Sequence, residues 1–303
     1  MTWAELRASA EHRLLACGIG DAATEARWML EQVSGMDPAE QIMRGRSSAT
    51  RRAVTALDEL VERRAAGEPL QYVLGSWGFC GLDLLVDRRV LIPRPETEVV
   101  AQLAIEELRR RGERVGRRDA WAGTDTAYAV ADLGTGSGAL ALALAAALPD
   151  AQVWATDVSA EALSVARANI AAAGTPSARV RTAHGSWFEA LAPELCGQLL
   201  MVVANPPYIG EHEREELPTE VRDWEPEHAL ISGPTGLEAI AHLIVEAPRW
   251  LRPDGVLVLE LAPHQAERAV QMATDAGFVD VEVAKDLAAR DRVLIARRES
   301  PSF

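Results

Sequence analysis

Over residues 1–75, apolar side chains recur every three or four positions, which is the spacing of amphipathic helices. Thr2 and Glu5 form the capping-box pattern that starts a helix. The successive runs stop where glycines occur, at Gly18, near Gly35 and at Gly67. This pattern predicts a small all-helical domain over residues 1–75.

The spacing then changes to the alternation that is typical of strands. Phe79, Leu82 and Leu84 alternate with polar or small residues, and glycines lie at one end of the stretch. We assign residues 76–93 to a β-hairpin that links two domains. A helix from about Glu96 to Arg111 is expected next, followed by a polar, glycine-containing linker over residues 112–126.

From Tyr128 onward, short strand-like runs alternate with helical ones. The alternation predicts an α/β fold, a mostly parallel seven-stranded sheet covered by helices on both faces, within residues 94–303. Ligands of such sheets bind at the carboxyl ends of strands, beside the topological switch point. The strand-like runs are 128–133, 152–157, 179–183, 199–204, 255–261, 279–283 and 292–296, and the helical runs are 139–148, 160–173, 237–251 and 265–276.

Composition narrows the class of protein. The 303 residues are 48% apolar, which is enough for a core and excludes a disordered chain. No run approaches the ~18–20 apolar residues of a membrane span, and the N-terminus lacks the features of a secretory signal. The three cysteines lie far apart without metal-ligand spacing, so we expect reduced thiols, no metal and a cytoplasmic location.

The net charge of −14 weighs against a nonspecific nucleic-acid surface, because neutralising phosphates requires clustered Lys and Arg. A local basic patch remains compatible with an acidic total.

A glycine-rich loop follows the first predicted strand of the α/β region. Glycines at alternate positions let the backbone turn sharply and approach a ligand at the start of the next helix. Asp157 ends the second strand, 23 residues after the first glycine, where a carboxylate can accept both ribose hydroxyls of a nucleoside. The alternative role of Asp157 is to cap the next helix. The loop consists of Gly134, Thr135, Gly136, Ser137 and Gly138.

Asp132 precedes these glycines on an apolar strand. Two roles are equally compatible with this position: organising the backbone N–H groups of the loop, or contacting the ligand. Taken together, the loop and Asp157 predict a nucleoside site and leave open which nucleoside cofactor binds.

The fourth strand of this region ends in Asn205-Pro206-Pro207-Tyr208. Two prolines stop the strand and stiffen the backbone, which fixes the Asn205 side chain and the Pro206 carbonyl at the strand's end. Both groups offer acceptor oxygens. Two acceptors and a nearby aromatic ring suit a planar –NH2 group. The alternative is a purely structural role, a diproline turn capped by the asparagine.

These residues resemble the class I S-adenosylmethionine-dependent methyltransferases that alkylate planar nitrogens, and within them the PrmC/HemK family of peptide-chain-release-factor N5-glutamine methyltransferases. The resemblance covers nearly the whole chain. It rests on segments 69–75, 91–98, 132–138, 185–188, 205–209, 225–227, 285–287 and 290–293.

The resemblance implies a cofactor, S-adenosyl-L-methionine, and roles for several residues. Gly134 to Gly138 are expected to bind the cofactor backbone, Asp157 the ribose, and Trp187 the adenine, although Trp187 is also compatible with a plain core aromatic. The glutamine amide of the substrate is expected at the motif formed by Asn205, Pro206, Pro207 and Tyr208, with Asn205, Pro206 and Tyr208 as the catalytic residues and Asn205 close enough to touch the cofactor.

The family also implies a partner, the Gly-Gly-Gln loop of bacterial class I release factors, with the helical domain holding a second part of that partner. Arg94, Glu96 and Thr97 are expected on a proline-stiffened segment over the cofactor pocket. A solvated or purely structural pair of Arg94 with Glu96 is an equal alternative. The chain departs from the family at residues 199–204, at Ala262 and at Ala289, the last two standing where glycine is usual. These departures affect local loop geometry.

Two other functions compete with this interpretation. One is methylation of an exocyclic amine in DNA or RNA, which requires an electropositive groove. Residues 209–230 instead carry eight carboxylates against Arg214 and Arg222, which makes a poor neighbour for phosphate. The other is an inactive cofactor-binding scaffold, which the intact Asn-Pro-Pro-Tyr motif disfavours.

Overall fold

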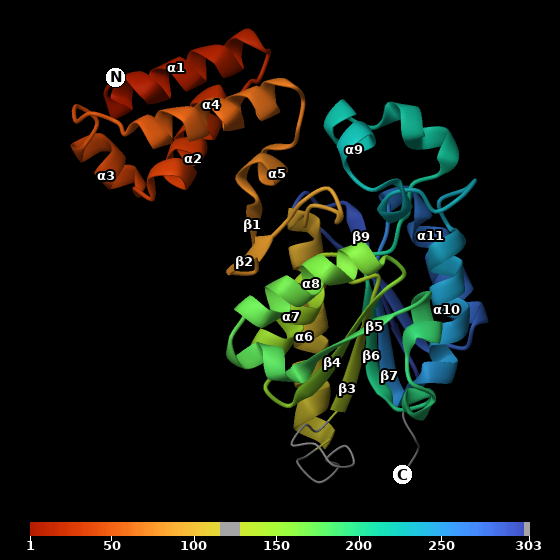
Figure 1. Ribbon diagram of the computed structural model, residues 1–303. Helices are drawn as coiled ribbons and strands as arrows, with labels where there is room; N and C mark the ends of the chain where they lie inside the picture. The colour runs from red at the N-terminus through yellow and green to blue at the C-terminus, as the bar shows by residue number, and fades with distance from the viewer. Residues whose placement is uncertain (116–127, 300–303) are drawn as a thin grey trace. The chain divides into compact units, whose positions relative to one another are not determined.

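The computed structural model describes residues 1–115 and 128–299, and for residues 112–115 it describes the backbone alone. The chain divides into two compact units (Figure 1). The helical unit is Met1–Ser76 with Pro218–Trp224, and the sheet unit is Trp77–Leu217 with Glu225–Phe303. Most of the predicted linker, residues 116–126, lies outside the described residues.

The helical unit contains six of the described helices. Its first helix begins with the predicted capping box, in which Thr2 accepts from the Glu5 N–H and Glu5 accepts from the Thr2 N–H. Leu14, Met29 and Leu57 fill its core with no more than 1% of their surface exposed. The helices are α1 (Trp3–Ala16), α2 (Ala22–Ser34), α3 (Pro38–Met43), α4 (Arg51–Ala65), α5 (Leu70–Leu74) and α9 (Thr219–Trp224).

The sheet unit contains a seven-stranded sheet in the order β5-β4-β3-β6-β7-β9-β8. All neighbouring strands are parallel except β9, which runs antiparallel to β7 and β8. The predicted fold class is therefore confirmed. The strands are β3 (Tyr128–Leu133), β4 (Ala151–Asp157), β5 (Val180–His184), β6 (Leu199–Ala204), β7 (Leu251–Glu260), β8 (Asp280–Lys285) and β9 (Asp291–Arg297), and a separate two-stranded sheet holds β1 (Ser76–Phe79) and β2 (Leu82–Leu85).

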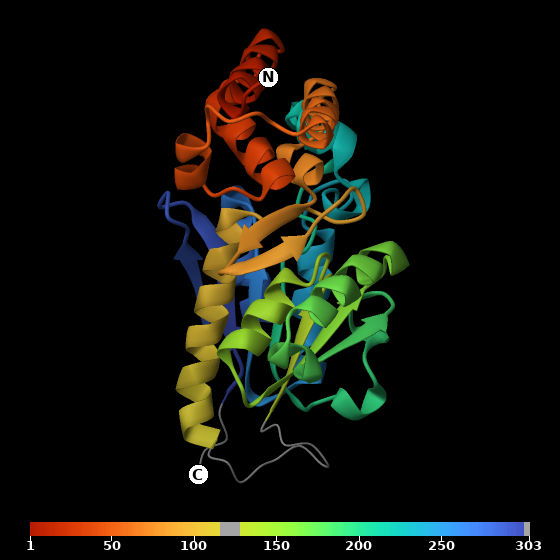
Figure 2. The same cartoon turned by 60° about the vertical axis from the view of Figure 1, so that its left-hand side comes forward.

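Helices cover both faces of this sheet, because its central strands are apolar on both sides. One apolar core joins the sheet to α6 (Pro95–Val115), α7 (Ala139–Ala147) and α8 (Ala160–Ala172), and a second joins it to α10 (Glu238–Trp250) and α11 (Ala266–Asp275). Figure 2 shows the long α6 running beside the sheet.

The predicted end of the helix before the linker was wrong. The linker was expected from residue 112, but α6 continues to Val115. A glycine costs a helix interior only ~1 kcal/mol relative to alanine, and Gly112 alone does not end a helix whose inner face is already packed on the sheet.

The sheet topology fixes where a ligand site forms. The chain runs outward from β3 to β4 and β5, then returns to place β6 on the other side of β3. Leu133 pairs with Thr156 and Asp132 pairs with Val203, so the carboxyl ends of three strands meet at this switch point. No helix in the described part of the chain is long and apolar enough to cross a membrane.

Candidate active site

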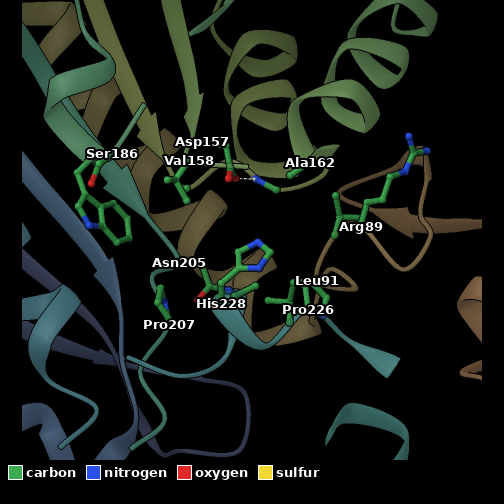
Figure 3. Close-up of a pocket in the computed structure, with 15 residues that line it drawn as sticks. Arg89, Leu91, Asp157, Val158, Ala162, Ser186, Asn205, Pro207, Pro226 and His228 are labelled. Atoms are coloured by element: carbon green, nitrogen blue, oxygen red, sulfur yellow. Dashed lines mark hydrogen bonds between the residues drawn. The ribbon is translucent and has the colours of Figure 1, made fainter. Parts of the chain in front are cut away.

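A pocket lies at this switch point, within the sheet unit (Figure 3). It encloses about 720 Å³ of space that is partly open to solvent, which is within the usual range for a small-molecule site. Its lining comes from the loops after β3, β4, β5 and β6 and from two further segments. The lining residues are Arg89, Val90, Leu91, Gly134, Gly136, Asp157, Val158, Ala162, Ser186, Trp187, Asn205, Pro207, Pro226, His228 and Ala229.

Gly134 lies against an aromatic ring at the wall of the pocket. A Cβ at this position would lie 3.3 Å from Cζ3 of Trp187, and the backbone φ of Gly134 is +76°. Both facts favour glycine here. Trp187, itself at a φ of +45°, is half-buried and turned so that its ring faces the loop, where a flat ligand can lie against it.

Asp157 is largely buried at the end of β4 and organises two backbone segments. One carboxylate oxygen accepts from the Gly136 N–H at 2.9 Å (Figure 3). The other accepts from the Ser159 N–H at 2.8 Å. The N-cap of α8 is Ser159, whose hydroxyl accepts from the Ala162 N–H. Asp157 is therefore not the side-chain cap of this helix, and its carboxylate still borders the pocket.

Asp132 stands behind the glycine loop and is fully buried. Its Oδ2 accepts from the Thr135 hydroxyl at 2.6 Å and from the Ala141 N–H at 3.0 Å. Burial raises the pKa of this carboxyl to about 7. Of the two roles that the sequence left open, the geometry favours the organising one, because Asp132 bonds the loop and helix and does not line the pocket.

The Asn205 side chain lies at the end of β6 and is anchored from behind. Its Nδ2 donates to the Thr97 hydroxyl at 3.0 Å, and that hydroxyl donates to Glu260 at 2.7 Å. Tyr208 donates its phenolic proton to the other oxygen of Glu260 at 3.3 Å. Burial and the adjacent carboxylate raise the pKa of Tyr208, so the phenol stays protonated at neutral pH.

Of the two roles expected for Arg94, Glu96 and Thr97, the structure favours the one away from the pocket. Arg89, Val90 and Leu91 line the pocket, whereas Arg94, Glu96 and Thr97 do not. Arg94 forms an ion pair with Glu225, and Glu96 forms one with Arg290 at 2.9 Å.

The structure brings together only part of the predicted site at the pocket wall. Gly134, Gly136, Asp157, Trp187, Asn205 and Pro207 line it. Thr135 and Ser137 are buried behind the loop, Gly138 begins α7, Pro206 is buried, and Tyr208 points to Glu260.

Sequence reasoning missed His228, Arg89 and Glu260. Figure 3 shows the His228 imidazole reaching into the pocket from the segment that follows α9. The Glu-Pro pair at 225–226 was the signal that pointed to this segment. Glu260 carried no such signal, because a polar residue at a strand's end is ordinary.

This arrangement supports one kind of chemistry. Asp157 and Trp187 border the space where a nucleoside fits, and Asn205 places an amide beside it. Glycine at Gly134, where a Cβ would crowd the ring of Trp187, leaves the wall open to a flat ligand. These residues fit an adenosine-containing cofactor next to a group that is held by hydrogen bonds.

Two family models match the chain. Residues 5–75 match the "PrmC N-terminal domain", and residues 122–221 match the "Methyltransferase small domain". The second match includes the glycine loop, Asp157, Trp187 and the Asn-Pro-Pro-Tyr motif.

Curated relatives match over nearly the whole chain. A release factor glutamine methyltransferase of Deinococcus radiodurans is 39% identical over 97% of this chain and 98% of its own length. Another of the same description, from Geobacter sulfurreducens, is 38% identical over 92% of this chain and 91% of its own length.

Among solved structures, the hMettl16 catalytic domain in complex with the MAT2A 3′UTR hairpin 6 has a TM-score of 0.53 at 14% identity, covering 82% of each chain. This likeness concerns the fold alone.

Proposed function

This chain belongs to the family of release factor glutamine methyltransferases, and on that premise we propose that it transfers a methyl group to the side-chain nitrogen, N5, of a release-factor glutamine. The donor is S-adenosyl-L-methionine, and the target is the glutamine of the Gly-Gly-Gln motif of bacterial class I release factors. A release factor acts in translation, so the proposal assigns the reaction to the cytoplasm. One observation carries it: a single pocket is lined by Gly134, Asp157 and Asn205.

The cofactor supplies an electrophilic methyl group on a sulfonium. We assign Asp157 to the ribose hydroxyls and Trp187 to the adenine face, since both line the pocket. Gly134, Thr135, Gly136, Ser137 and Gly138 then hold the cofactor backbone, with Thr135 and Ser137 acting from behind.

A glutamine amide nitrogen is a poor nucleophile because its lone pair is delocalised into the carbonyl. We assign Asn205 Oδ1 and the Pro206 carbonyl to accept the two hydrogens of the substrate –NH2. Holding the nitrogen in line with the methyl group supplies several kcal/mol, up to ~7–11 in the best intramolecular systems. Pro207 and Tyr208 keep this acceptor pair rigid, and the surplus proton leaves to water.

Methylation of an amine in DNA or RNA is the competing function. The acidic segment of residues 209–230 follows the substrate motif in the sequence, and its 3₁₀ turn Glu211–Glu216 exposes Glu211, Glu215 and Glu216. Exposed carboxylates at this place repel a phosphate backbone. This favours a protein substrate.

We further propose that the helical unit holds a second part of the release factor. Exposed apolar residues stand on α3, where Ile42 is 78% and Met43 is 76% exposed. Four exposed arginines follow along the same stretch of chain, and none forms an ion pair within the described residues: Arg44, Arg46, Arg51 and Arg52. In a chain with a net charge of −14, this surface fits an acidic face of a protein partner.

To test the reaction, the purified protein is incubated with labelled cofactor and each of three acceptors. These are a release factor, its Gly-Gly-Gln variant with Gln→Ala, and a mixture of DNA and RNA. We expect label in the unchanged release factor alone. Label in nucleic acid and none in the release factor would overturn the proposal.

A charge reversal tests the docking surface. The double variant Arg46→Glu/Arg51→Glu is expected to raise KM for the intact release factor about 10-fold, because rim charges act mainly on association. Cofactor affinity and kcat should be unchanged. Arg268→Glu, at an exposed arginine of α11 in the sheet unit, is the matched control. Equal KM values for both variants would contradict the docking surface.

A further inference from the structure

Behind Asn205 lies a line of polar atoms that ends in a buried carboxylate. Asn205 Nδ2 donates to Thr97 Oγ1 at 3.0 Å, and Thr97 Oγ1 is 2.7 Å from an oxygen of Glu260. Thr97 is 4% exposed and Glu260 is 0% exposed. Asn205 directly follows β6, Thr97 lies in the first turn of α6 and Glu260 ends β7; these segments are far apart in the sequence and all within the sheet unit.

The direction of these bonds follows from counting protons. A carboxylate only accepts, and a hydroxyl has one proton to donate. Thr97 therefore gives its proton to Glu260 and accepts from its other neighbour. That neighbour must be the –NH2 end of the Asn205 amide, so the oxygen of this amide points away from Thr97.

An asparagine amide has two ends of nearly equal shape, and packing alone does not choose between them. Thr97 is buried away from the pocket, whereas Asn205 lines it. The end turned away from Thr97 is the end that a substrate meets. For a substrate that presents –NH2, this end has to be the oxygen.

We propose that Thr97 and Glu260 are positioning residues that set the orientation of the Asn205 amide, so that its oxygen faces the substrate nitrogen. The inference rests on the proposed function, since it gives the acceptor role of Asn205 a structural cause. Neither residue touches substrate or cofactor. Each acts through Asn205.

A protonated Glu260 would remove this preference. A carboxylic acid donates to Thr97, which then is free to donate to Asn205, and the amide turns its –NH2 toward the substrate. Two –NH2 groups would then face each other. Transfer should consequently slow when Glu260 takes up a proton.

The groups around Glu260 come from three parts of the chain. Thr97 and Glu96 face it from α6, Tyr208 from the substrate motif and Arg292 from β9. Burial raises the pKa of Glu260 above its ordinary value, while the bonds from Thr97 and Tyr208 and the charge of Arg292 act in the opposite direction. Loss of rate on the acid side is therefore expected at a higher pH than for an exposed glutamate.

The test compares Thr97→Val with Thr97→Ser in single-turnover methylation of the intact release factor from pH 5.5 to 8. Valine has the shape of threonine without the hydroxyl, whereas serine keeps the hydroxyl. We expect Thr97→Val to slow transfer at pH 8 by about 10- to 100-fold, the range found for residues that orient metal ligands through hydrogen bonds. Thr97→Ser should stay within about threefold of the unchanged protein.

The pH profile separates orientation from mere packing. The unchanged protein and Thr97→Ser should methylate more slowly toward pH 5.5. The rate of Thr97→Val should not depend on pH in this way, because no hydroxyl links Glu260 to Asn205. Glu260→Gln should also be slower and flat over this range. Thr156→Val is the matched control, since Thr156 is a fully buried threonine whose hydroxyl has no partner among the described residues. It should change neither rate nor profile.

A second readout does not depend on methylation. The side-chain –NH2 resonances of Asn205, identified by their absence in Asn205→Ala, should move between pH 5.5 and 8 in the unchanged protein and not in Thr97→Val. If this shift is seen in a protein that fails to methylate release factors, the positioning role of Thr97 and Glu260 is supported and the proposed function is contradicted. Two results would overturn the positioning role: Thr97→Val keeps the full rate of an active protein, or the Asn205 resonances shift neither with the substitution nor with pH.

Discussion

Arg94 and Glu225 are 131 residues apart in the sequence and form an ion pair in which the glutamate side chain is only 1% exposed. Glu225 also accepts from the backbone N–H of Ile92 at 3.3 Å. The neighbours of these residues, Leu91 and Pro226, both line the pocket. The pair thus ties together two segments that line the pocket.

Removing the Arg94 side chain should loosen these two segments. Breaking a fully buried pair costs ~3–5 kcal/mol, and we expect about 2–3 kcal/mol for Arg94→Ala because Arg94 is 30% exposed. Affinity for S-adenosylmethionine should fall as well. Urea unfolding and titration calorimetry measure the two effects. In a double-mutant cycle with Glu225→Gln, a coupling below about 0.5 kcal/mol would mean that the pair does not hold the two segments together.

Asp157→Ala should lower affinity for the cofactor by about 10- to 150-fold, the value of charge-assisted hydrogen bonds to one ligand group. Ser159→Ala is the control, because it removes the hydroxyl that caps α8 at 3.1 Å and leaves the pocket intact. The control should cost about 1 kcal/mol of stability and no affinity. If the Asp157→Ala protein is folded and binds the cofactor with normal affinity, the carboxylate of Asp157 only organises the loop.

Some residues of this site could be predicted from the sequence, and others could not. The glycine loop, Asp157 and Asn205 each follow a strand directly, and parallel strands bring such positions to one edge of the sheet. Local pattern therefore suffices to find them. Thr97 and Glu260 meet across 163 residues of chain, and no local pattern encodes their contact.

The fold shows the same division. The run at 199–204 coincides with β6, since a strand that is buried on both faces is apolar throughout. The strand expected from 255 begins at Leu251 instead, because its first residues pair with β6 before a shift in register. That extension includes Arg252, Pro253 and Asp254, whose polar or turn-forming side chains conceal it in the sequence.

The departure from the family at Ala289 predicts a stabilising substitution. Ala289 has a φ of +60°, in the left-handed region that costs a residue with a Cβ ~1–2 kcal/mol. Ala289→Gly should therefore raise the free energy of unfolding, by about 0.5–1 kcal/mol after the greater flexibility of glycine in the unfolded chain is subtracted. Ala262, the other position where glycine is usual in the family, has a φ of −76°, and Ala262→Gly should instead destabilise the protein. Chemical denaturation of both variants checks the opposite signs.

Asp132 gives the protein a pH-dependent stability of known sign. Burial raises its folded-state pKa from 3.8 to about 7, so between these values the folded protein holds a proton that the unfolded chain releases. The stability from this proton is complete below about pH 4 and is lost as pH rises through 7. Asp132→Asn cannot ionise, and relative to the unchanged protein it should gain about 1–3 kcal/mol between pH 4.5 and pH 8.

Urea unfolding at pH 4.5, 6 and 8 measures this gain. Glu267→Gln, at an exposed carboxylate of α11, serves as the control and should keep a constant difference from the unchanged protein. A constant difference for Asp132→Asn as well would show that Asp132 is ionised in the folded protein throughout this range.

In the proposed reaction, Asn205 is the residue on which the chemistry depends most directly. Asn205→Ala removes the acceptor for the substrate –NH2 and should lower single-turnover transfer at least ~100-fold, equivalent to ~2.7 kcal/mol of transition-state stabilisation. Cofactor affinity should change much less, since the glycine loop and Asp157 remain.

Asn205→Asp has nearly the same shape and keeps an acceptor, yet we expect it to be slow too. The Thr97 hydroxyl gives its proton to Glu260 and offers only lone pairs to position 205, where a carboxylate would meet repulsion instead of a bond. A second negative charge would also stand close to the buried Glu260. Transfer at saturating cofactor, paired with cofactor titration of each variant, measures both effects. A loss below tenfold in Asn205→Ala would reduce this residue to a cap on the diproline turn.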